Sequence, residues 1–434
     1  MATVNVITLG CSKNLVDSER VLKLLSDAGF DAVHESEDKT DIVVINTCGF
    51  IGDAKEESVN TIMEYVNAKN QGDVAEIYVM GCLSERYRDE LRNEIPEVDK
   101  FYGKFDWNTL AEDLSKRHIK FSPVDRTLTT PSHHAYLKIS EGCNRHCAFC
   151  AIPIITGHHK SRPMEEIENE VRMLIQRGVK EFNIIAQDLS GYGLDLYGAQ
   201  KLPELVERIA DIPGVKWLRL HYAYPAQFPH GILEVMRNHD NVCSYLDIAL
   251  QHISDNVLAR MKRHINAAET RSLLAEMRQQ VPDIHIRTTL MVGFPGETEA
   301  DFEELLDFVR EQRFERMGAF AYCEEEGTFA AINYDDEIPQ EVKQARLDRL
   351  MALQEEISTE IQQQKVGSVF EVVIDREEEE FYVGRTQWDS PEVDPEVLVR
   401  KTTPLTIGQF YNVRITEALP FELIGEIHDS SNAQ

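Results

Sequence analysis

Short apolar runs alternate with amphipathic segments through the first third of the chain. Each apolar run has the length of a strand, and each amphipathic segment has the spacing of a helix. The predicted strands are Val4–Leu9, Asp41–Asn46 and Glu76–Met80, and the predicted helices are Leu15–Ala28, Ala54–Ala68 and Glu85–Glu94. Strands that alternate with helices are typical of parallel sheets with crossover helices. The pattern predicts an open parallel-sheet α/β domain over residues 1–122.

The alternation pauses at residues 121–134 and then resumes. This segment contains Pro123 and Pro131 among Ser, Thr and His, which is the composition of a linker. The strands predicted after it are Ala135–Ile139, Phe182–Ala186, Trp217–His221, Tyr245–Leu250, Ile284–Val292 and Met317–Ala321, with helices such as Met164–Gln176 and Ala300–Gln312 between them. About six βα units predict a partial (β/α)6 barrel over residues 133–364, with its active site at the carboxyl ends of the strands.

The pattern changes once more near the end of the chain. One long helix is predicted over Gln340–Gln364, and from Val369 onward the residues alternate between apolar and polar. The runs VFEVVID, EFYVG, VLVRK, FYNVRITEA and FELIGEI each have the length of a short strand. Five such strands predict a small antiparallel β-barrel over residues 365–434.

Composition indicates a globular protein of the cytoplasm. The chain has 434 residues, of which 42% are hydrophobic, and no apolar stretch reaches the length that spans a membrane. Its start, MATVNVITLGC, lacks the basic region of a secretion signal. In a reducing compartment the eight cysteines are expected to be ligands rather than disulfide partners.

The net charge of −30 narrows the range of partners. A strongly acidic chain disfavours partners that consist mostly of phosphate backbone, since these select basic surfaces. It is compatible with a basic protein partner that is attracted by opposite charge. Solubility alone explains such a charge equally well.

Three cysteines form the densest candidate site in the chain. Cys143, Cys147 and Cys150 lie at CxxxCxxC spacing directly after the apolar run Ala135–Ile139. Thiolates suit iron–sulfur clusters, and an ordinary electron-transfer cluster takes four of them. Structural zinc is the alternative, but closed zinc sites also use four ligands. Three local cysteines therefore favour a 4Fe–4S cluster with one iron open to a non-protein ligand.

A second set of cysteines follows the predicted strands of the first domain. Cys11, Cys48 and Cys82 each come one to three residues after a strand, beside a glycine. Ligands of open parallel sheets bind outside the carboxyl ends of the strands, so these thiols are expected to converge on a second cluster. Buried structural thiols are the alternative, and this is the interpretation for Cys243 and Cys323, which have no companions at ligand spacing.

The cysteine spacing, with Phe149 before the last cysteine, resembles the radical S-adenosylmethionine (SAM) enzymes. The resemblance implies that the free iron binds SAM and that an electron from the cluster cleaves it to a 5′-deoxyadenosyl radical. GFPGET looks like the loop that closes beside SAM in that family. Strand-end position and this resemblance make Phe149, Gln187, Gly293 and Glu297 the candidate SAM contacts, although Glu297 equally suits the first turn of a helix.

The segments TLGCSKNLVDSE, NTCGFI and GCLSERY resemble the amino-terminal domain of the methylthiotransferases. Within that family, GCSKNLVDSE is most similar to the ribosomal-protein aspartate methylthiotransferases. The resemblance implies a transferase that places a methylthio group on the β-carbon of an aspartate in the twelfth small-subunit ribosomal protein. It further implies two 4Fe–4S clusters, SAM as methyl donor and radical source, a reductant such as flavodoxin or ferredoxin, and a carboxyl-terminal TRAM domain that binds substrate.

The charge of the carboxyl-terminal module bears on the substrate. Residues 367–434 contain five basic and 14 acidic residues, including the run Glu377–Glu380 and a cluster near Asp389–Glu396. We expect such a surface to attract a basic ribosomal protein and to disfavour RNA. A solvated acidic hairpin tip would also explain the glutamate run.

Two other functions are consistent with parts of the chain. A transfer-RNA methylthiotransferase would use the same machinery, but it predicts a basic carboxyl-terminal module and a different motif at the first cysteine. An iron–sulfur electron carrier built on a flavodoxin-like domain would account for the cysteines, but it predicts neither a barrel nor the GFPGET loop.

Overall fold

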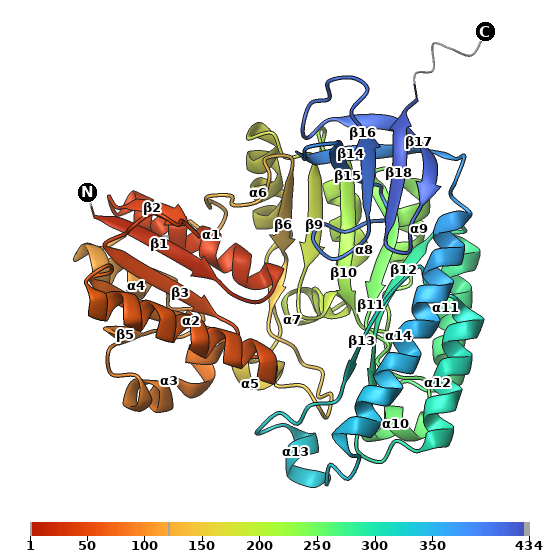
Figure 1. Ribbon diagram of the computed structural model, residues 1–434, viewed down its shortest axis with the longest axis horizontal. Coiled ribbons are helices and arrows are strands. Elements are labelled where there is room, and N and C mark those ends of the chain that lie inside the picture. The colour runs from red at the N-terminus through yellow and green to blue at the C-terminus, as the bar shows by residue number, and fades with distance from the viewer. Residues whose placement is uncertain (1, 120–121, 429–434) are drawn as a thin grey trace.

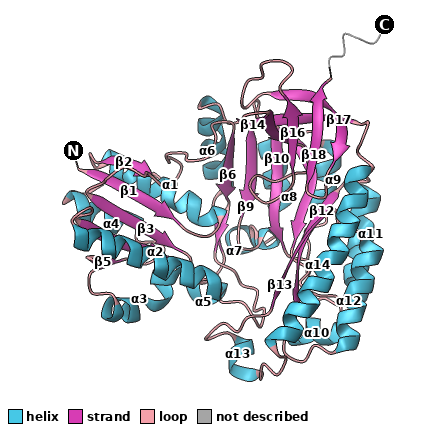
Figure 2. Ribbon diagram, viewed as in Figure 1, coloured by secondary structure: helices cyan, strands magenta, loops and turns pink. Residues whose placement is uncertain are grey.

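Three units follow one another along the chain, each built around its own sheet (Figure 1). The structure is a computed structural model that describes residues 2–119 and 122–428. Residues 120–121, at the predicted boundary between the first two domains, lie outside the described residues. The two α/β units and the β-barrel that the sequence predicts are all present (Figure 2), so the fold class is confirmed.

The first unit is a five-stranded parallel sheet with strand order β2-β1-β3-β4-β5. Apolar side chains of α1 and α4 pack on one face of the sheet, and those of α2 and α3 pack on the other. The elements are β1 (Thr3–Thr8), α1 (Ser12–Asp27), β2 (Asp31–His34), β3 (Ile42–Thr47), α2 (Gly52–Gln71), β4 (Glu76–Gly81), α3 (Cys82–Glu94), β5 (Lys100–Phe101) and α4 (Trp107–Ser115). The sequence prediction missed β2, β5 and α4, which are short.

The second unit is a six-stranded parallel sheet with strand order β13-β12-β11-β10-β9-β6, flanked by helices. It is an open sheet, as expected of a partial barrel. Its amino-terminal half contains β6 (His134–Lys138), β7 (Ser140–Glu141), α5 (Ile152–Thr156), β8 (Lys160–Ser161), α6 (Met164–Gln176), β9 (Glu181–Ile185), η1 (Leu189–Gly191), α7 (Leu194–Tyr197), α8 (Leu202–Ala210) and β10 (Trp217–Ala223). Its remainder contains α9 (Gly231–Asn238), β11 (Val242–Ile248), α10 (Asp255–Arg260), α11 (Ala267–Gln280), β12 (His285–Val292), α12 (Glu299–Gln312), β13 (Arg316–Ala321), α13 (Phe329–Asn333) and α14 (Gln340–Gln363).

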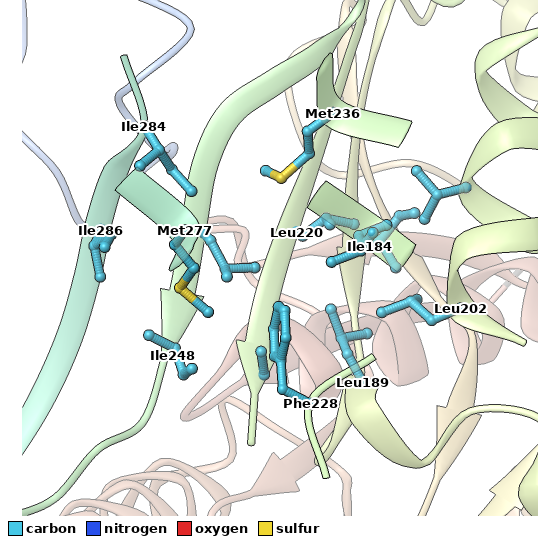
Figure 3. Close-up of a cluster of buried hydrophobic side chains, with 14 of the residues drawn as sticks. Ile184, Leu189, Leu202, Leu220, Phe228, Met236, Ile248, Met277, Ile284 and Ile286 are labelled. Atoms are coloured by element: carbon cyan, nitrogen blue, oxygen red, sulfur yellow. The ribbon is translucent and has the colours of Figure 1, made fainter. Parts of the chain in front are cut away.

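The largest core lies between this sheet and its helices. Ile184, Leu220, Ile248 and Ile286 lie on four neighbouring strands and are fully buried. Figure 3 shows these side chains beside those of the surrounding helices, including Met236 of α9. Burial of such side chains contributes about 1.5–3 kcal/mol each relative to exposure. This core gives the strand ends a rigid base.

The third unit is a closed five-stranded barrel with strand order β14-β15-β16-β18-β17. All neighbouring strands are antiparallel except β16 and β18, which run parallel. The strands are β14 (Val369–Glu377), β15 (Phe381–Arg385), β16 (Glu396–Arg400), β17 (Phe410–Ala418) and β18 (Glu422–Ile427). Helix α14 leads from the central unit into this barrel.

The barrel packs on the amino ends of the central strands, whereas α13 lies at the opposite end of that sheet (Figure 1). The rings of Trp217 and Phe410 meet with centroids 4.8 Å apart. Buried Glu181, at the start of β9, accepts hydrogen bonds from Arg219 and from Arg385 of the barrel. The contact therefore combines apolar packing with buried charge.

The loop between β15 and β16 corrects one expectation about the acidic surface. Asp389 is buried in an ion pair with Arg316, and Asp394 is paired with Arg287 at 2.9 Å. Tyr245 also donates a hydrogen bond to Asp394 at 2.7 Å. The acidic cluster near Asp389–Glu396 is therefore largely a docking contact within the chain rather than a surface for a partner.

The two remaining cysteines differ in their surroundings. Cys243 is buried beside Trp217 and Tyr245, as predicted for a structural thiol. Cys323 is exposed, so the prediction of a buried thiol is wrong for this residue. It follows β13, in a segment where sequence pattern alone does not reveal exposure. None of the helices in the described part of the chain is long and apolar enough to cross a membrane.

We expect the substitution Glu181→Gln to destabilise the protein by about 3–5 kcal/mol, because it removes the negative charge that pairs with two buried arginines. Burial would raise the pKa of Glu181, but Arg385 and Arg219 outweigh this effect and lower it to about 2. A carboxylate with a depressed pKa stabilises the folded state above its unfolded pKa of about 4.3, and this contribution is lost as the pH falls towards 2. Chemical denaturation at several pH values measures both effects.

The matched control is Glu234→Gln, which removes the same charge from an exposed position on α9. Its effect should stay within about 0.5 kcal/mol. If the unfolding free energy of Glu181→Gln kept the acid dependence of the parent protein, the role given to this carboxylate would be wrong.

Candidate active site

A pocket of about 390 Å³ lies between the carboxyl ends of the two parallel sheets. All six cysteines of the two predicted sets line it: Cys11, Cys48, Cys82, Cys143, Cys147 and Cys150. Cys11 and Cys48 come from the loops after β1 and β3, Cys82 begins α3 directly after β4, and the others come from the loop after β6 and β7. Topology thus brings together thiols that lie up to 139 positions apart in the sequence.

Glycines let the three amino-terminal loops approach one another. Gly10 has φ +94°, and a Cβ atom built on it would lie 2.8 Å from the Cβ atom of Cys48. Gly81 has φ +99°, and its Cβ atom would lie 2.5 Å from the carbonyl oxygen of Thr47. Both positions require a residue without a side chain, because of the backbone conformation and because of the space.

Asn14, on the first turn of α1, connects the same three loops. Its amide Nδ2 donates to the carbonyl oxygens of Leu9 at 2.9 Å and of Thr47 at 3.1 Å. Its Oδ1 accepts from the Cys82 thiol at 3.6 Å and from Lys104 Nζ at 3.3 Å. One buried side chain therefore contacts each segment that carries a cysteine of the amino-terminal set, Cys11, Cys48 and Cys82.

Cationic and polar groups surround the set of Cys143, Cys147 and Cys150. The backbone N–H of Arg145 donates to Cys143 Sγ at 3.3 Å, and the guanidinium of Arg263 donates to Cys147 Sγ at 3.2 Å. The hydroxyl of Tyr224 lies 3.8 Å from Cys147 Sγ. The N–H donors of Arg145 and Arg263 stabilise thiolates, which are the form in which cysteine binds metal, whereas the Tyr224 hydroxyl donates to the carbonyl oxygen of Arg263.

Burial raises the pKa of most of these thiols, to about 11 for Cys48 and about 12 for Cys143. Cys11 differs, because it faces the pocket beside two lysines. Burial would also raise the pKa of Cys11, but Lys13, the backbone N–H of Asn14 and Lys104 outweigh it and lower the pKa. The protonated thiols must lose their protons when metal binds, so binding is linked to pH.

The arrangement suits a cluster better than a single metal ion. Among residues 2–119 and 122–428, no three His, Cys, Asp or Glu side chains converge closely enough to hold one ion. The thiolates around a 4Fe–4S cluster each bind a different iron, so they need not converge on a point. Three cysteines per set around a shared pocket therefore fit the geometry that iron–sulfur clusters require.

Two pocket residues have strained backbones. Tyr222 has φ +67° at the carboxyl end of β10, and Gln251 has φ +72° just after β11. Left-handed conformations are costly for such residues and concentrate at functional sites. The Oε1 atoms of Gln187 and Gln251 are buried and have no hydrogen-bond partner among the described residues. These amides are available for a ligand in the pocket.

The structure brings only two of the four predicted SAM contacts to the pocket. Phe149 and Gln187 line it. Gly293 and Glu297 do not: Glu297 accepts hydrogen bonds from the N–H groups of Gly293 at 2.6 Å and Phe294 at 3.3 Å, and it pairs with Arg346 of α14 at 3.0 Å. Glu297 thus closes its own turn against α14. The SAM role of Gly293 and Glu297 stays a prediction.

The sequence analysis missed several charged and aromatic residues of the pocket. Arg145 is inside the cysteine motif and Lys13 is two positions after Cys11, so proximity to a ligand could have indicated both. Tyr222 and Tyr224 lie at the carboxyl end of β10, beyond the predicted strand Trp217–His221, where the rule that strand ends carry the site indicates them. Arg263 lies between two helices and has no signal in the sequence.

Comparison with known families covers most of the chain. Residues 3–103 match the uncharacterized protein family UPF0004, residues 137–309 match the radical SAM superfamily, and residues 366–427 match the TRAM domain. Together with a pocket that two cysteine sets share, these matches define the class as a radical SAM enzyme with an additional amino-terminal domain and a TRAM barrel.

Curated relatives show which family of radical SAM enzymes the chain belongs to. The chain is 62% identical to the ribosomal protein uS12 methylthiotransferase RimO of Bacteroides fragilis, over 98% of this chain and 99% of the relative. It is 59% identical to RimO of Porphyromonas gingivalis and 51% identical to RimO of Christiangramia forsetii, over 98% of this chain and 99% and 94% of those proteins. The chain belongs to the RimO family.

Solved structures of low sequence identity share the fold. The radical SAM methyltransferase TsrM from Kitasatospora setae aligns with a TM-score of 0.58 and 14% identity, over 76% of this chain and 77% of that chain. The cobalamin-dependent radical SAM enzyme OxsB aligns with a TM-score of 0.52 and 12% identity, over 82% and 56%. An open sheet domain beside a partial barrel is thus an architecture found in other radical SAM enzymes.

We expect Asn14→Ala to loosen the three amino-terminal cysteine loops. The substitution leaves two buried carbonyl groups without donors, which costs about 1–3 kcal/mol of stability. In the metal-free protein, a thiol reagent should label buried Cys48 and Cys82 faster in Asn14→Ala than in the parent, whereas accessible Cys11 should react at a similar rate. Mass spectrometry of peptides measures each rate.

The control is Asn60→Ala, at an exposed position on α2. It should change neither the stability nor the labelling rates. Unchanged labelling of Cys48 and Cys82 in Asn14→Ala would show that the loops hold their positions without this amide.

Proposed function

We propose that this chain is a radical SAM methylthiotransferase that places a methylthio group on the β-carbon of an aspartate in ribosomal protein uS12. One observation carries the proposal: both cysteine sets line a single pocket in a chain that is 62% identical to RimO over nearly its whole length. Transfer to an unactivated carbon requires that the target side chain meet a radical source and a sulfur source in the same enclosed space.

We assign Cys143, Cys147 and Cys150 to the 4Fe–4S cluster that binds SAM, and Cys11, Cys48 and Cys82 to an auxiliary 4Fe–4S cluster. When bound, these groups supply hydrogen abstraction from the target carbon and the sulfur that is transferred. The surroundings of each set support the assignment: Arg263 contacts a sulfur of the first set, and Lys104 is directed towards the second through Asn14.

The chain's own residues position the reactants and exclude water. Phe149 and Ile155 contribute apolar surface to the pocket, and the amides of Gln187 and Gln251 are available to bind polar parts of SAM or substrate. Exclusion of water protects a radical from side reactions and strengthens the electrostatic interactions inside the pocket. We include Gly293 and Glu297 only as residues that support SAM binding from outside the pocket, through the turn that they form.

The partners follow from the same proposal. Ribosomal protein uS12 is the substrate, and a reductant such as flavodoxin or ferredoxin supplies the electron. Glu377 and Glu378 are paired with Lys401 and Arg376, so the negative charge of the β14–β15 tip comes mainly from Glu379 and Glu380. This tip and the overall charge of −30 favour a basic protein over RNA.

We also propose domain boundaries and a compartment. The amino-terminal domain comprises residues 1–122, the radical SAM domain residues 133–364 and the TRAM domain residues 365–434. All eight cysteines are free, and the substrate is a ribosomal protein, so we assign the enzyme to the cytoplasm.

The test is an anaerobic assay of reconstituted enzyme with SAM, reductant and either uS12 or transfer RNA. We expect uS12 to gain the mass of a methylthio group in place of hydrogen, with formation of 5′-deoxyadenosine. Cys143→Ala should abolish both products. Cys11→Ala should retain deoxyadenosine formation but lose transfer, and each variant should lose about half of the iron, since each removes one of two equal clusters.

Cys323→Ala is the matched control, because Cys323 is exposed and is not among the residues that line the pocket. It should keep full iron content and activity. Methylthio transfer to transfer RNA alone would overturn the substrate and leave the chemistry intact. Absence of deoxyadenosine from fully loaded enzyme would overturn the enzyme class and favour an electron carrier.

A further inference from the structure

The charged side chains that line the pocket are all positive. Four cationic side chains line it, namely those of Lys13, Lys104, Arg145 and Arg263, and no carboxylate of the described residues does so. An apolar pocket that contains only positive charge disfavours a cationic ligand and favours an anionic one.

Three of these cations are already engaged within the chain. Lys104 forms an ion pair with buried Asp17 at 2.9 Å, and Arg145 forms one with Asp188 at 2.8 Å. Arg263 donates to Cys147 Sγ at 3.2 Å and to a backbone carbonyl. Lys13 forms no ion pair within 4.0 Å among residues 2–119 and 122–428. Its charge acts on the Cys11 thiol and on the Tyr222 ring but is not neutralised by a carboxylate within ion-pair distance, so it can also attract an anionic ligand.

Lys13 reaches from one domain to the other. It lies two positions after Cys11, and its Nζ atom lies 3.2 Å from the centroid of the Tyr222 ring at the end of β10. The strained backbone of Tyr222, with φ +67°, directs this ring to the junction between the two cysteine sets. Contact with an aromatic face is a weak interaction for an ammonium group and is readily replaced by a carboxylate.

The nearest carboxylate on the central sheet does not neutralise this lysine. Asp247 acts on Lys13 only from beyond ion-pair distance, and its Oδ2 accepts the backbone N–H of Tyr222 at 3.3 Å. Burial raises the pKa of Asp247 to about 6, against the effect of Arg287. Asp247 thus supports the Tyr222 backbone rather than the Lys13 ammonium.

We propose that Lys13 binds the side-chain carboxylate of the aspartate that the enzyme modifies, and this inference rests on the proposed function. The β-carbon of an aspartate is bonded directly to its carboxylate carbon. A carboxylate held by Lys13, next to Cys11 and across from the Cys143–Cys150 loop, therefore places the reacting carbon between the two cysteine sets. Lys13 is a specificity-determining residue that selects aspartate over its neutral isostere.

SAM also carries a carboxylate, so the carboxylate that Lys13 binds has two possible sources, SAM and the substrate aspartate. Lys13 belongs to the loop of the amino-terminal set, whereas the cation that touches the SAM-binding set is Arg263. This placement assigns the Lys13 site to the substrate. The experiment must therefore measure the affinity for each ligand separately.

The experiment compares reconstituted parent enzyme with Lys13→Met and Lys13→Arg. Two substrates are used: uS12, and uS12 in which the target aspartate is replaced by asparagine. Binding of each substrate in the presence of SAM, and binding of SAM alone, are measured anaerobically. Transfer to uS12 by the parent enzyme is recorded first, because its failure would reject the proposed function independently of Lys13.

We expect the parent to bind the aspartate substrate about 10- to 100-fold more tightly than the asparagine substrate, because a buried charge pair is lost. Compared with the parent at equal iron content, Lys13→Met should bind both substrates equally weakly and keep its affinity for SAM. Lys13→Arg should restore part of the discrimination. A purely structural role for Lys13 would weaken binding of both substrates and preserve their ratio.

The control is Lys39→Met, which removes the same charge from an exposed lysine that pairs with Asp73 away from the pocket. It should bind both substrates as the parent does. If Lys13→Met still discriminates aspartate from asparagine as the parent does, the inference is overturned. If it instead loses affinity for SAM and keeps the discrimination, the carboxylate at this site belongs to SAM and the substrate assignment is wrong.

Discussion

Buried ion pairs between the two α/β units hold the carboxyl ends of their sheets face to face. Asp17 of α1 is fully buried and pairs both with Lys104 of its own domain and with Lys138 of β6 in the central domain. Lys138 also pairs with Glu141, directly before the cysteine loop. Removal of one partner from such a pair costs about 3–5 kcal/mol, so alternative orientations of the two domains are strongly disfavoured. The shared pocket depends on this orientation.

A second group of buried charges extends the same contact. Glu19 pairs with Arg126, and Arg126 and Arg162 both pair with Glu170 of α6. Buried charges are not an efficient source of stability compared with apolar packing. Their value here is directional, since the series of pairs from Glu19 through Arg126 to Glu170 is complete in only one arrangement of the domains. A reaction that needs two cysteine sets around one substrate requires an arrangement of that kind.

The sequence predicts those parts of the site that depend on local pattern and topology. Helix Met164–Gln176 has the bounds predicted for it, and the positions of Cys11, Cys48 and Cys82 after strands were sufficient to place them on one edge. Side-chain contacts between residues that lie far apart in the sequence cannot be predicted from local pattern in this way. The burial of Asp389 and Asp394 depends on Arg316 and Arg287 in another domain, and the exposure of Cys323 depends on the path of a loop. Likewise, nothing in GFPGET indicates that Glu297 would turn away from the pocket to meet Arg346.

The TRAM barrel and the pocket lie at opposite ends of the central sheet. The barrel contacts the amino ends of the central strands through residues such as Glu181 and Trp217, whereas the pocket is formed at their carboxyl ends. A partner bound to the barrel is therefore held at the end of the sheet opposite to the reacting groups. Such a contact increases the local concentration of substrate, but it cannot distinguish one side chain from another inside the pocket. In the proposed function, selection of the reacting residue comes from groups that line the pocket, and Lys13, which has no carboxylate partner among the described residues, is the one that we propose distinguishes an acid from an amide of the same shape.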